Sequence, residues 1–308
     1  MKNQAVLDRQ LQEFFGKYSY PNDLQPLDDE LEQRHLDLYR FFLRCLNLSL
    51  EEVTAGRVLD VGCGAGDLAI RRFGRWGANV VCLDLSGESL RLAKGKAVKL
   101  SLDRMSFVTA TAHVLPFGDG QFDVVHSHGV LHHSGNPVGG FREMVRVCRR
   151  GGLLLLGLYS KFGYFPRSLR RAFLRVVAGR DLDRQVALAR TVFSAPPSLR
   201  QSQDVFWYNE CHPIVSTHTY GEVLGWFRQN NIDWMGFYPS LAPGRFWNAL
   251  LYQLKTSRNP RVQRWARLAP EWYVREGKDN TAFFNRFLVQ ALMPLTGQSM
   301  LHIAGVKR

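Results

Sequence analysis

The chain has 308 residues, 45% of them hydrophobic and 22% charged, a composition typical of a folded globular protein. No apolar run reaches the roughly 18 residues that a membrane-spanning helix needs, and no signal-peptide core follows Met1, so we expect a cytoplasmic protein. The five cysteines are scattered without a CxxC pair, which favours reduced thiols over a disulfide framework or structural zinc.

The chain is strongly basic, with 40 Lys and Arg against 27 Asp and Glu and a formal net charge of +13. Residues 161–200 contain nine of these cations and two acids. A basic surface attracts nucleic acid, an anionic membrane or an acidic substrate, and it can equally be a solvated face without a specific partner. We expect no stable nucleic acid partner, because an RNA-binding module and a base-flipping motif are both missing. Peripheral membrane contact stays open.

Residues 1–50 predict N-terminal helices, for example over 28–46, where apolar residues recur at helical spacing. Apolar strands and polar helices then alternate within a core that we assign to residues 51–158. This alternation predicts an α/β fold, with a doubly wound, mostly parallel sheet and helices on both faces. The predicted strands are 57–61, 79–84, 106–109, 122–126 and 152–158, and the predicted helices are 67–76, 87–99 and 138–149.

The alternation breaks after Tyr159, and residues 159–218 predict a basic, aromatic cap insertion. Within it, 162–177 is a basic amphipathic helix, for which we favour an apolar side packed on the core and cations in water. A lid over an acidic ligand and a membrane-surface helix are the alternatives. The rest of the core is predicted in 219–308, as a helix over 219–229 and strands over 234–237 and 299–306, which bring the sheet to seven strands. A second insertion occupies about 239–298.

A glycine-rich loop follows the first predicted strand, from Asp60 through Gly62, Gly64 and Gly66. Glycines allow a tight turn and close approach to a ligand, and ligands of open α/β sheets bind at the carboxyl ends of the strands. The dinucleotide fingerprint G-x-G-x-x-G would need glycine where Asp67 stands, and an aspartate there repels a pyrophosphate. The spacing G-x-G-x-G after an acid favours a cationic sulfonium cofactor instead.

The ordered set of motifs resembles class I, Rossmann-like S-adenosylmethionine-dependent methyltransferases, in the small-molecule subgroup similar to quinone-ring methyltransferases. The resemblance covers residues 55–158 and, weakly, 212–238. It rests on 57–66 as the first motif, 84–86 as the ribose-binding turn, 112–117 and 122–125 beside the adenine, and 130–137 with 143–152 as later motifs.

The resemblance implies the cofactor S-adenosyl-L-methionine, methyl transfer to a small-molecule acceptor, and roles for particular residues. The acceptor atom (O, N or C) stays open. The alternatives for the acceptor are a natural product, a quinone or a lipid-like compound, of aromatic or acidic character. The implied cofactor residues are Asp60, Gly62, Cys63, Gly64 and Gly66 for the methionine part, Asp84 and Leu85 for the ribose, Thr111, Ala112 and His113 for the adenine, and His128 near the sulfonium.

The chain departs from the family at Thr111, where the family usually has an aspartate that binds the adenine amino group. The threonine hydroxyl can accept one hydrogen bond, but a neutral acceptor is weaker than a carboxylate. The adenine contacts of this chain are therefore expected to differ from those of the family.

Methyl transfer depends chiefly on aligning the two reactants, and a general base helps when the acceptor carries a proton. The candidate bases are His212, His133 and His132, with His212 preferred because it precedes a proline on a non-helical turn. Each can instead be a structural histidine. A metal site from Cys211, His212 and His218 is poorly spaced and is not expected. An RNA methyltransferase and a non-catalytic cofactor-binding scaffold remain as alternative functions.

Overall fold

The computed structural model describes residues 2–17, 39–40, 43–44, 46–193, 203–212, 214–238 and 299–308. The predicted helix over 28–46 and the predicted second insertion over 239–298 lie almost wholly outside the described residues. Among the described residues, no helix is both long and apolar enough to cross a membrane.

Within the described residues, seven strands form one sheet in the order β3–β2–β1–β4–β5–β7–β6. The strands from β1 to β5 pair in parallel, whereas β7 runs antiparallel to both β5 and β6. The predicted α/β fold is thus confirmed, and the sheet is mixed, with β7 antiparallel to both of its neighbours. The strands are β1 (Arg57–Val61), β2 (Asn79–Asp84), β3 (Met105–Thr109), β4 (Phe122–His128), β5 (Cys148–Tyr159), β6 (Ile232–Tyr238) and β7 (Met300–Lys307).

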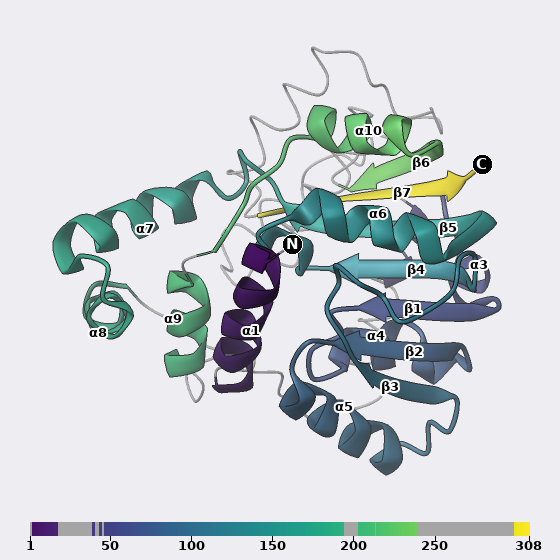
Figure 1. Ribbon diagram of the computed structural model, residues 1–308, viewed down its shortest axis with the longest axis horizontal. Helices are drawn as coiled ribbons and strands as arrows, with labels where there is room; N and C mark the ends of the chain where they lie inside the picture. The colour runs from purple at the N-terminus through teal and green to yellow at the C-terminus, as the bar shows by residue number, and fades with distance from the viewer. Residues whose placement is uncertain are drawn as a thin grey trace, which may run out of the picture.

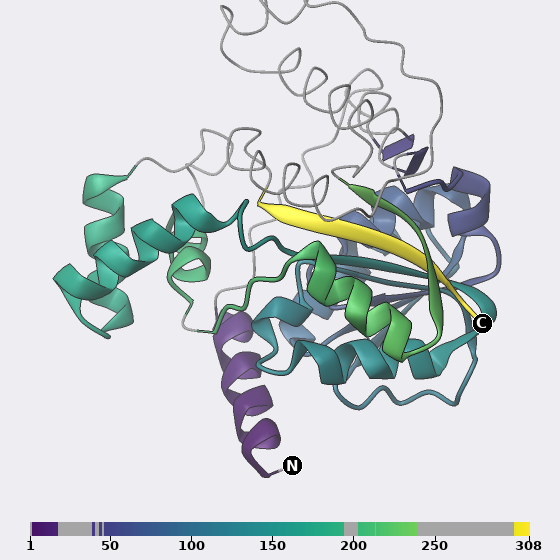
Figure 2. The same cartoon turned by 90° about the horizontal axis from the view of Figure 1, so that it is seen from above.

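Helices cover both faces of this sheet (Figure 2). The described helices are α1 (Lys2–Lys17), α3 (Leu50–Thr54), α4 (Asp67–Arg72), α5 (Gly87–Lys99), α6 (Pro137–Val147), α7 (Phe165–Ala178), α8 (Leu182–Val192), α9 (Gln203–Cys211) and α10 (Tyr220–Gln229), with short 3₁₀ turns at Gly74–Trp76 and Leu131–His133. The helix predicted over 67–76 ends at Arg72 and resumes as the first of these turns. A glycine at position 74 weakens a helix there.

The core consists of two apolar layers, one on each face of the sheet. On one face α6 and α10 pack through side chains such as Phe141 and Phe227. On the other face α3, α4 and α5 pack through Val53, Phe73 and Leu90. Strand β1 is buried between the layers from Val58 to Val61, while Arg57 at its start is exposed.

Helices α7, α8 and α9 project beyond the carboxyl ends of the parallel strands and share a small core of their own (Figure 1). Its largest side chain is Trp207, which is fully buried. The division of the chain at residues 50, 158 and 218 stays a prediction.

The expected orientation of α7 is wrong. Its apolar stripe faces outward, since Val176 is 85% exposed and Leu169 56% exposed. Two of its arginines turn inward instead, where Arg167 and Arg170 donate to the buried carboxylate of Glu210 on α9 at 2.9 and 2.8 Å. A buried carboxylate needs charged partners, and this requirement overrides the apolar periodicity of the helix.

Candidate functional site

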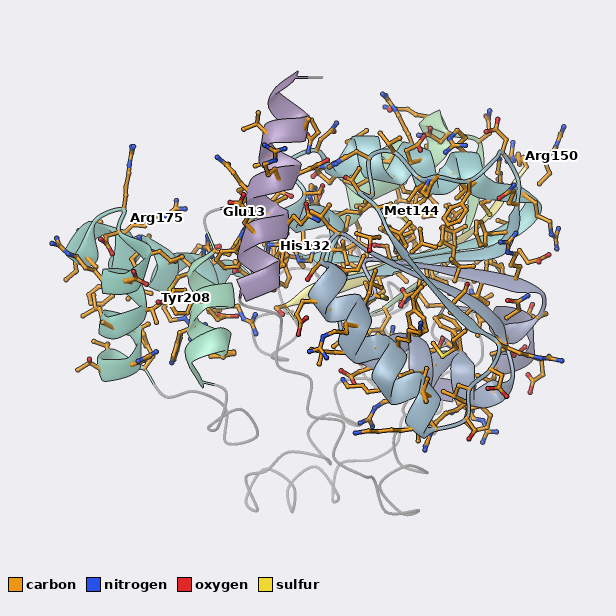
Figure 3. The ribbon with its side chains drawn as sticks, turned by 60° about the horizontal axis from the view of Figure 1, so that its bottom comes forward. Glu13, His132, Met144, Arg150, Arg175 and Tyr208 are labelled. Carbon is orange, nitrogen blue, oxygen red and sulfur yellow. The ribbon has the colours of Figure 1, made fainter. Side chains whose placement is uncertain are left out.

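A cavity of about 450 Å³ lies at the carboxyl ends of the parallel strands. Helix α1 stands across this edge of the sheet, between the strands and the α7–α9 group (Figures 1 and 3). The cavity is lined by the glycine loop and the end of β2 on one side, by the residues after β3 and β4 in the middle, and by side chains of α1, α7 and α9 on the other.

The glycine loop is held against the neighbouring strand by its own backbone. The amides of Gly62 and Cys63 donate to the carbonyl of Leu83 at 2.7 and 3.0 Å. Gly64 has a φ of +55°, and a Cβ at this position would meet no atom within 4 Å. Because Gly62, Cys63 and Gly64 all line the cavity, the open space beside Gly64 is space for a ligand.

Asp84 lines the cavity at the end of β2. Its Oδ2 accepts from the Gly64 amide and its Oδ1 from the Ser86 amide, both at 2.8 Å. Burial raises the pKa of Asp84, and these two amides partly offset that rise. A carboxylate offers about four lone-pair sites, so Asp84 retains capacity for a further donor such as a sugar hydroxyl. Leu85 lines the cavity beside it.

Two of the predicted loop residues lie outside the cavity lining. Asp60 is 2% exposed and lies beneath the loop, with Oδ1 2.6 Å from Nδ1 of His126 on β4. Gly66 precedes the first residue of α4 with a φ of +84°. Both therefore shape the loop from below, while the next residues, Asp67 and Leu68, line the cavity.

The segment predicted to border the adenine, Thr111 to His113, lines the middle of the cavity. The Thr111 hydroxyl donates to Oδ2 of Asp8 on α1 at 2.8 Å. Asp8, Leu11 and Phe15 of α1 also line the cavity, and sequence reasoning missed all three. A helix was predicted somewhere in residues 1–50, but its periodicity carries no information about the distant residues that it meets.

The candidate histidines divide into two groups. His128 and His133 line the cavity, whereas His132 and His212 belong to the layer behind it. Burial lowers the pKa of His133 to about 3 and that of His212 to about 4, so both are neutral near pH 7. Burial also holds the pKa values of His128 and His132 well below the usual value. The role of His212, His133 or His132 as a catalytic base stays a prediction.

The surroundings of His133 define its tautomer. Nδ1 lies 3.0 Å from the carbonyl oxygen of Ile214, and since a carbonyl can only accept, Nδ1 carries the proton. The lone pair of a neutral ring is then on Nε2. His212 packs behind, with its ring 5.5 Å from that of His133 and 4.4 Å from that of Phe14.

The far part of the cavity is mainly apolar, with a charged end. Phe15, Tyr159 and Met300 line it together with the ion pair of Arg167 and Glu210. Other aromatic residues of the cap, Phe206 and Trp207, pack in the small core that α7, α8 and α9 share.

Comparison with known proteins bears directly on this arrangement. Residues 59–156, which span β1 to β5 and the loops around the cavity, match the family described as "Methyltransferase domain". The match covers about a third of the chain, and this segment is similar to methyltransferase domains. The resemblance drawn from the glycine loop and the motifs after it is confirmed.

Curated relatives match the methyltransferase domain and its surroundings. The 27-O-demethylrifamycin SV methyltransferase of Amycolatopsis mediterranei is 38% identical over 102 residues, which cover 33% of this chain and 38% of that protein. Methyltransferase GfsG of Streptomyces halstedii is 33% identical over 144 residues, covering 46% of this chain and 49% of that protein. The chain thus spans less than half the length of these relatives.

Solved structures extend the similarity of fold beyond the methyltransferase domain. PKMT2 from Rickettsia typhi, solved in complex with AdoHcy, superposes with a TM-score of 0.53 and 12% sequence identity. The superposition covers 94% of this chain and 53% of that one. At this identity the comparison establishes the fold.

Proposed function

We propose that this chain transfers a methyl group from S-adenosylmethionine to a small-molecule acceptor. The observation that carries this proposal is the single cavity that joins two chemically different halves. One half has the glycine loop and the Asp84 carboxylate of a methyltransferase domain. The other has aromatic side chains, a neutral histidine and an ion pair, which suit an organic acceptor.

The residues of the first half match what the cofactor would need. Asp84 would accept a hydrogen bond from the ribose hydroxyls, and the space beside Gly64 would admit the methionine part. Leu85 and Ala112 offer apolar contacts for the faces of the adenine, and His128 lies farther along the cavity towards the acceptor half. When bound, the cofactor supplies a methyl group on a positively charged sulfur.

Alignment is the main contribution that we assign to the acceptor half. Positioned reactants can lower a barrier by roughly 7–11 kcal/mol through orientation alone. Phe15, Tyr159 and Met300 would hold an apolar or aromatic acceptor. Nε2 of His133 would accept a hydrogen bond from its reacting group, although a pKa of about 3 makes this histidine a weak base.

A natural-product acceptor is supported by the similarity to the rifamycin methyltransferase, whose name gives such an acceptor. An RNA acceptor is less well supported, because three arginines of α7 are engaged within the protein. Arg167 and Arg170 pair with Glu210, and Arg171 donates to the carbonyls of Glu210 and His212. These cations are therefore not available as a row of phosphate ligands.

Calorimetry with S-adenosylhomocysteine tests the cofactor assignment. Wild type should bind one equivalent, and Asp84→Ala should lose about 10- to 100-fold in affinity, as expected for hydrogen bonds to a charged group. Asp103→Ala, a matched change at an exposed aspartate, should bind as wild type does. NADH should not bind, because Asp67 lines the cavity where a pyrophosphate would lie. Failure of wild type to bind S-adenosylhomocysteine would remove the proposed function.

A further inference from the structure

The adenine region of the cavity contains a carboxylate that the methyltransferase motifs do not supply. The family pattern has an aspartate where this chain has Thr111, so the core sequence leaves the region without a charged acceptor. In the folded chain the Thr111 hydroxyl donates to Oδ2 of Asp8 at 2.8 Å, although the two residues are 103 positions apart. A carboxylate from α1 thus lies one hydrogen bond from the position of the missing one.

Asp8 is held in place from a second side. The side-chain amide of Gln4, one helical turn earlier, donates to Oδ1 of Asp8 at 2.9 Å and to the carbonyl of Ser134 at 3.0 Å. Nδ1 of His113 lies 3.3 Å from Oδ1 as well. The Asp8 side chain is 14% exposed, and the space that it faces is the cavity. Its geometry is therefore fixed before any ligand arrives.

The remaining acceptor capacity of Asp8 decides what it could bind. A carboxylate offers about four lone-pair sites, and the contacts from Thr111, Gln4 and His113 occupy at most three of them. A ligand donor in the cavity can use a further site. A charged acceptor makes a hydrogen bond roughly twice as strong as a neutral one, so Asp8 would outcompete the Thr111 hydroxyl for an amino group.

We infer that Asp8 accepts a hydrogen bond from the amino group of the cofactor's adenine, in place of the carboxylate that the core lacks at Thr111. This inference rests on the proposed function. It makes α1 a part of the cofactor site, and it assigns to Asp8 the discrimination between adenine and other nucleobases. A purely structural role, in which Asp8 only fastens α1 to the core through Thr111, is the alternative that an experiment must separate.

Base discrimination separates the two roles. S-Inosylhomocysteine carries a carbonyl oxygen where S-adenosylhomocysteine carries the amino group, and a carboxylate repels that oxygen. Wild type should therefore prefer the adenine ligand by about 100-fold in calorimetry, because a site built for a donor rejects the analogue that lacks it. In Asp8→Asn the side-chain amide can donate to the carbonyl oxygen, and the preference should fall below about tenfold.

A matched control lies on the same helix. Glu13→Gln removes the same charge from an exposed position of α1, which Figure 3 labels, and should leave both affinities and their ratio unchanged. If Asp8→Asn merely loosened α1, both ligands would lose affinity by the same factor. A ratio that stays at the wild-type value in Asp8→Asn would overturn the inference.

Returning a carboxylate to the core provides the rescue. In the double variant Asp8→Asn/Thr111→Asp the preference for the adenine ligand should recover to within a few fold of wild type, whereas a structural role for Asp8 predicts no recovery. If wild type binds neither ligand, the proposed function and this inference both fail. If wild type binds S-adenosylhomocysteine but does not discriminate against the inosine analogue, the inference alone fails.

Discussion

Arg72 and His126 form a partly buried contact in which only Arg72 can be the donor. Nη1 of Arg72 lies 3.2 Å from Nε2 of His126, and since a guanidinium cannot accept, Nε2 must. The proton of His126 is therefore on Nδ1, which donates to Asp60 at 2.6 Å. The three side chains form a directed chain beneath the glycine loop, from α4 through β4 to β1.

Substitution of His126, the middle residue of these three hydrogen-bonded side chains, should lower the stability of the fold. His126→Leu leaves the Asp60 carboxylate buried without its imidazole donor, and we expect a loss of about 3 kcal/mol in the free energy of unfolding. Urea denaturation measures this loss. The control is Ser127→Ala on the same strand, whose buried hydroxyl has no hydrogen-bond partner in the described structure, and it should cost under about 1 kcal/mol. Equal losses in the two variants would contradict the assignment.

Alanine substitutions at two glycines should distinguish an effect on stability from an effect on ligand binding. Gly64 and Gly77 have φ values of +55° and +76°, and neither has an atom within 4 Å of an added Cβ. Alanine should cost each site about 1 kcal/mol of backbone strain, seen as similar falls in Tm. Because Gly64 lines the cavity, only Gly64→Ala should also bind S-adenosylhomocysteine at least about tenfold more weakly. Unimpaired binding by Gly64→Ala would place the ligand elsewhere.

The buried histidines should make the fold sensitive to mild acid. Burial lowers the pKa of His133 and His302 to about 3 and that of His212 to about 4. In the unfolded chain these histidines take up protons below a pH of about 6.5. In the folded chain they take up protons only near their lowered pKa values. Stability is thus present above about pH 6.5 and falls as the pH decreases, by up to about 1.4 kcal/mol per pH unit for each histidine.

His212→Phe tests this pH dependence at one position. The ring packs between Phe14 and Phe15, so phenylalanine suits the site sterically. The loss of unfolding free energy between pH 7.5 and 5.0 should be smaller than in wild type by about 2 kcal/mol, measured by urea denaturation at both pH values. An unchanged loss would mean that His212 is protonated in the folded state.

Glu210 should control how firmly α7 is held. Glu210→Gln weakens both arginine contacts, and since Arg167 and Arg170 are 34% and 24% exposed, we expect a loss of only about 1–2 kcal/mol. Amide exchange should accelerate in α7. The control is Glu88→Gln, which removes an exposed pair with Arg91 and should leave the stability and the amide exchange of α7 unchanged. Exchange in α7 at the wild-type rate would contradict the role of Glu210.

Local patterns in the sequence predicted most of the sheet and the cofactor loop. Apolar runs such as Val58–Leu59 identify buried strands, and the positions of Gly64 and Asp84 identify a strand-to-helix ligand loop, because these signals act between near neighbours. The direction of β7 was not predicted, since an apolar strand looks the same in either direction. Asp8 was missed because its meaning depends on Thr111, which only the folded chain brings near.

The error at α7 has a different physical origin. Its periodicity correctly separated apolar from basic positions, but it did not say which side faces the protein. The side that faces the protein is set by Glu210 on α9, which forms ion pairs with the basic side of α7. No local sequence pattern indicates this partner. Sequence patterns thus predicted the helix, and a contact distant in the sequence set its orientation.

The place of β7 between β5 and β6 has a consequence for how a newly made chain matures. Strand β6 stands at the edge of the described sheet and joins it through β7, which is made some sixty residues later. Strand β7 also brings Met300 to the cavity and places His302 3.1 Å from His128. A nascent chain that has paired β1 to β5 therefore still has an unfinished cavity, and tight ligand binding would distinguish mature molecules from those in which β7 has yet to insert.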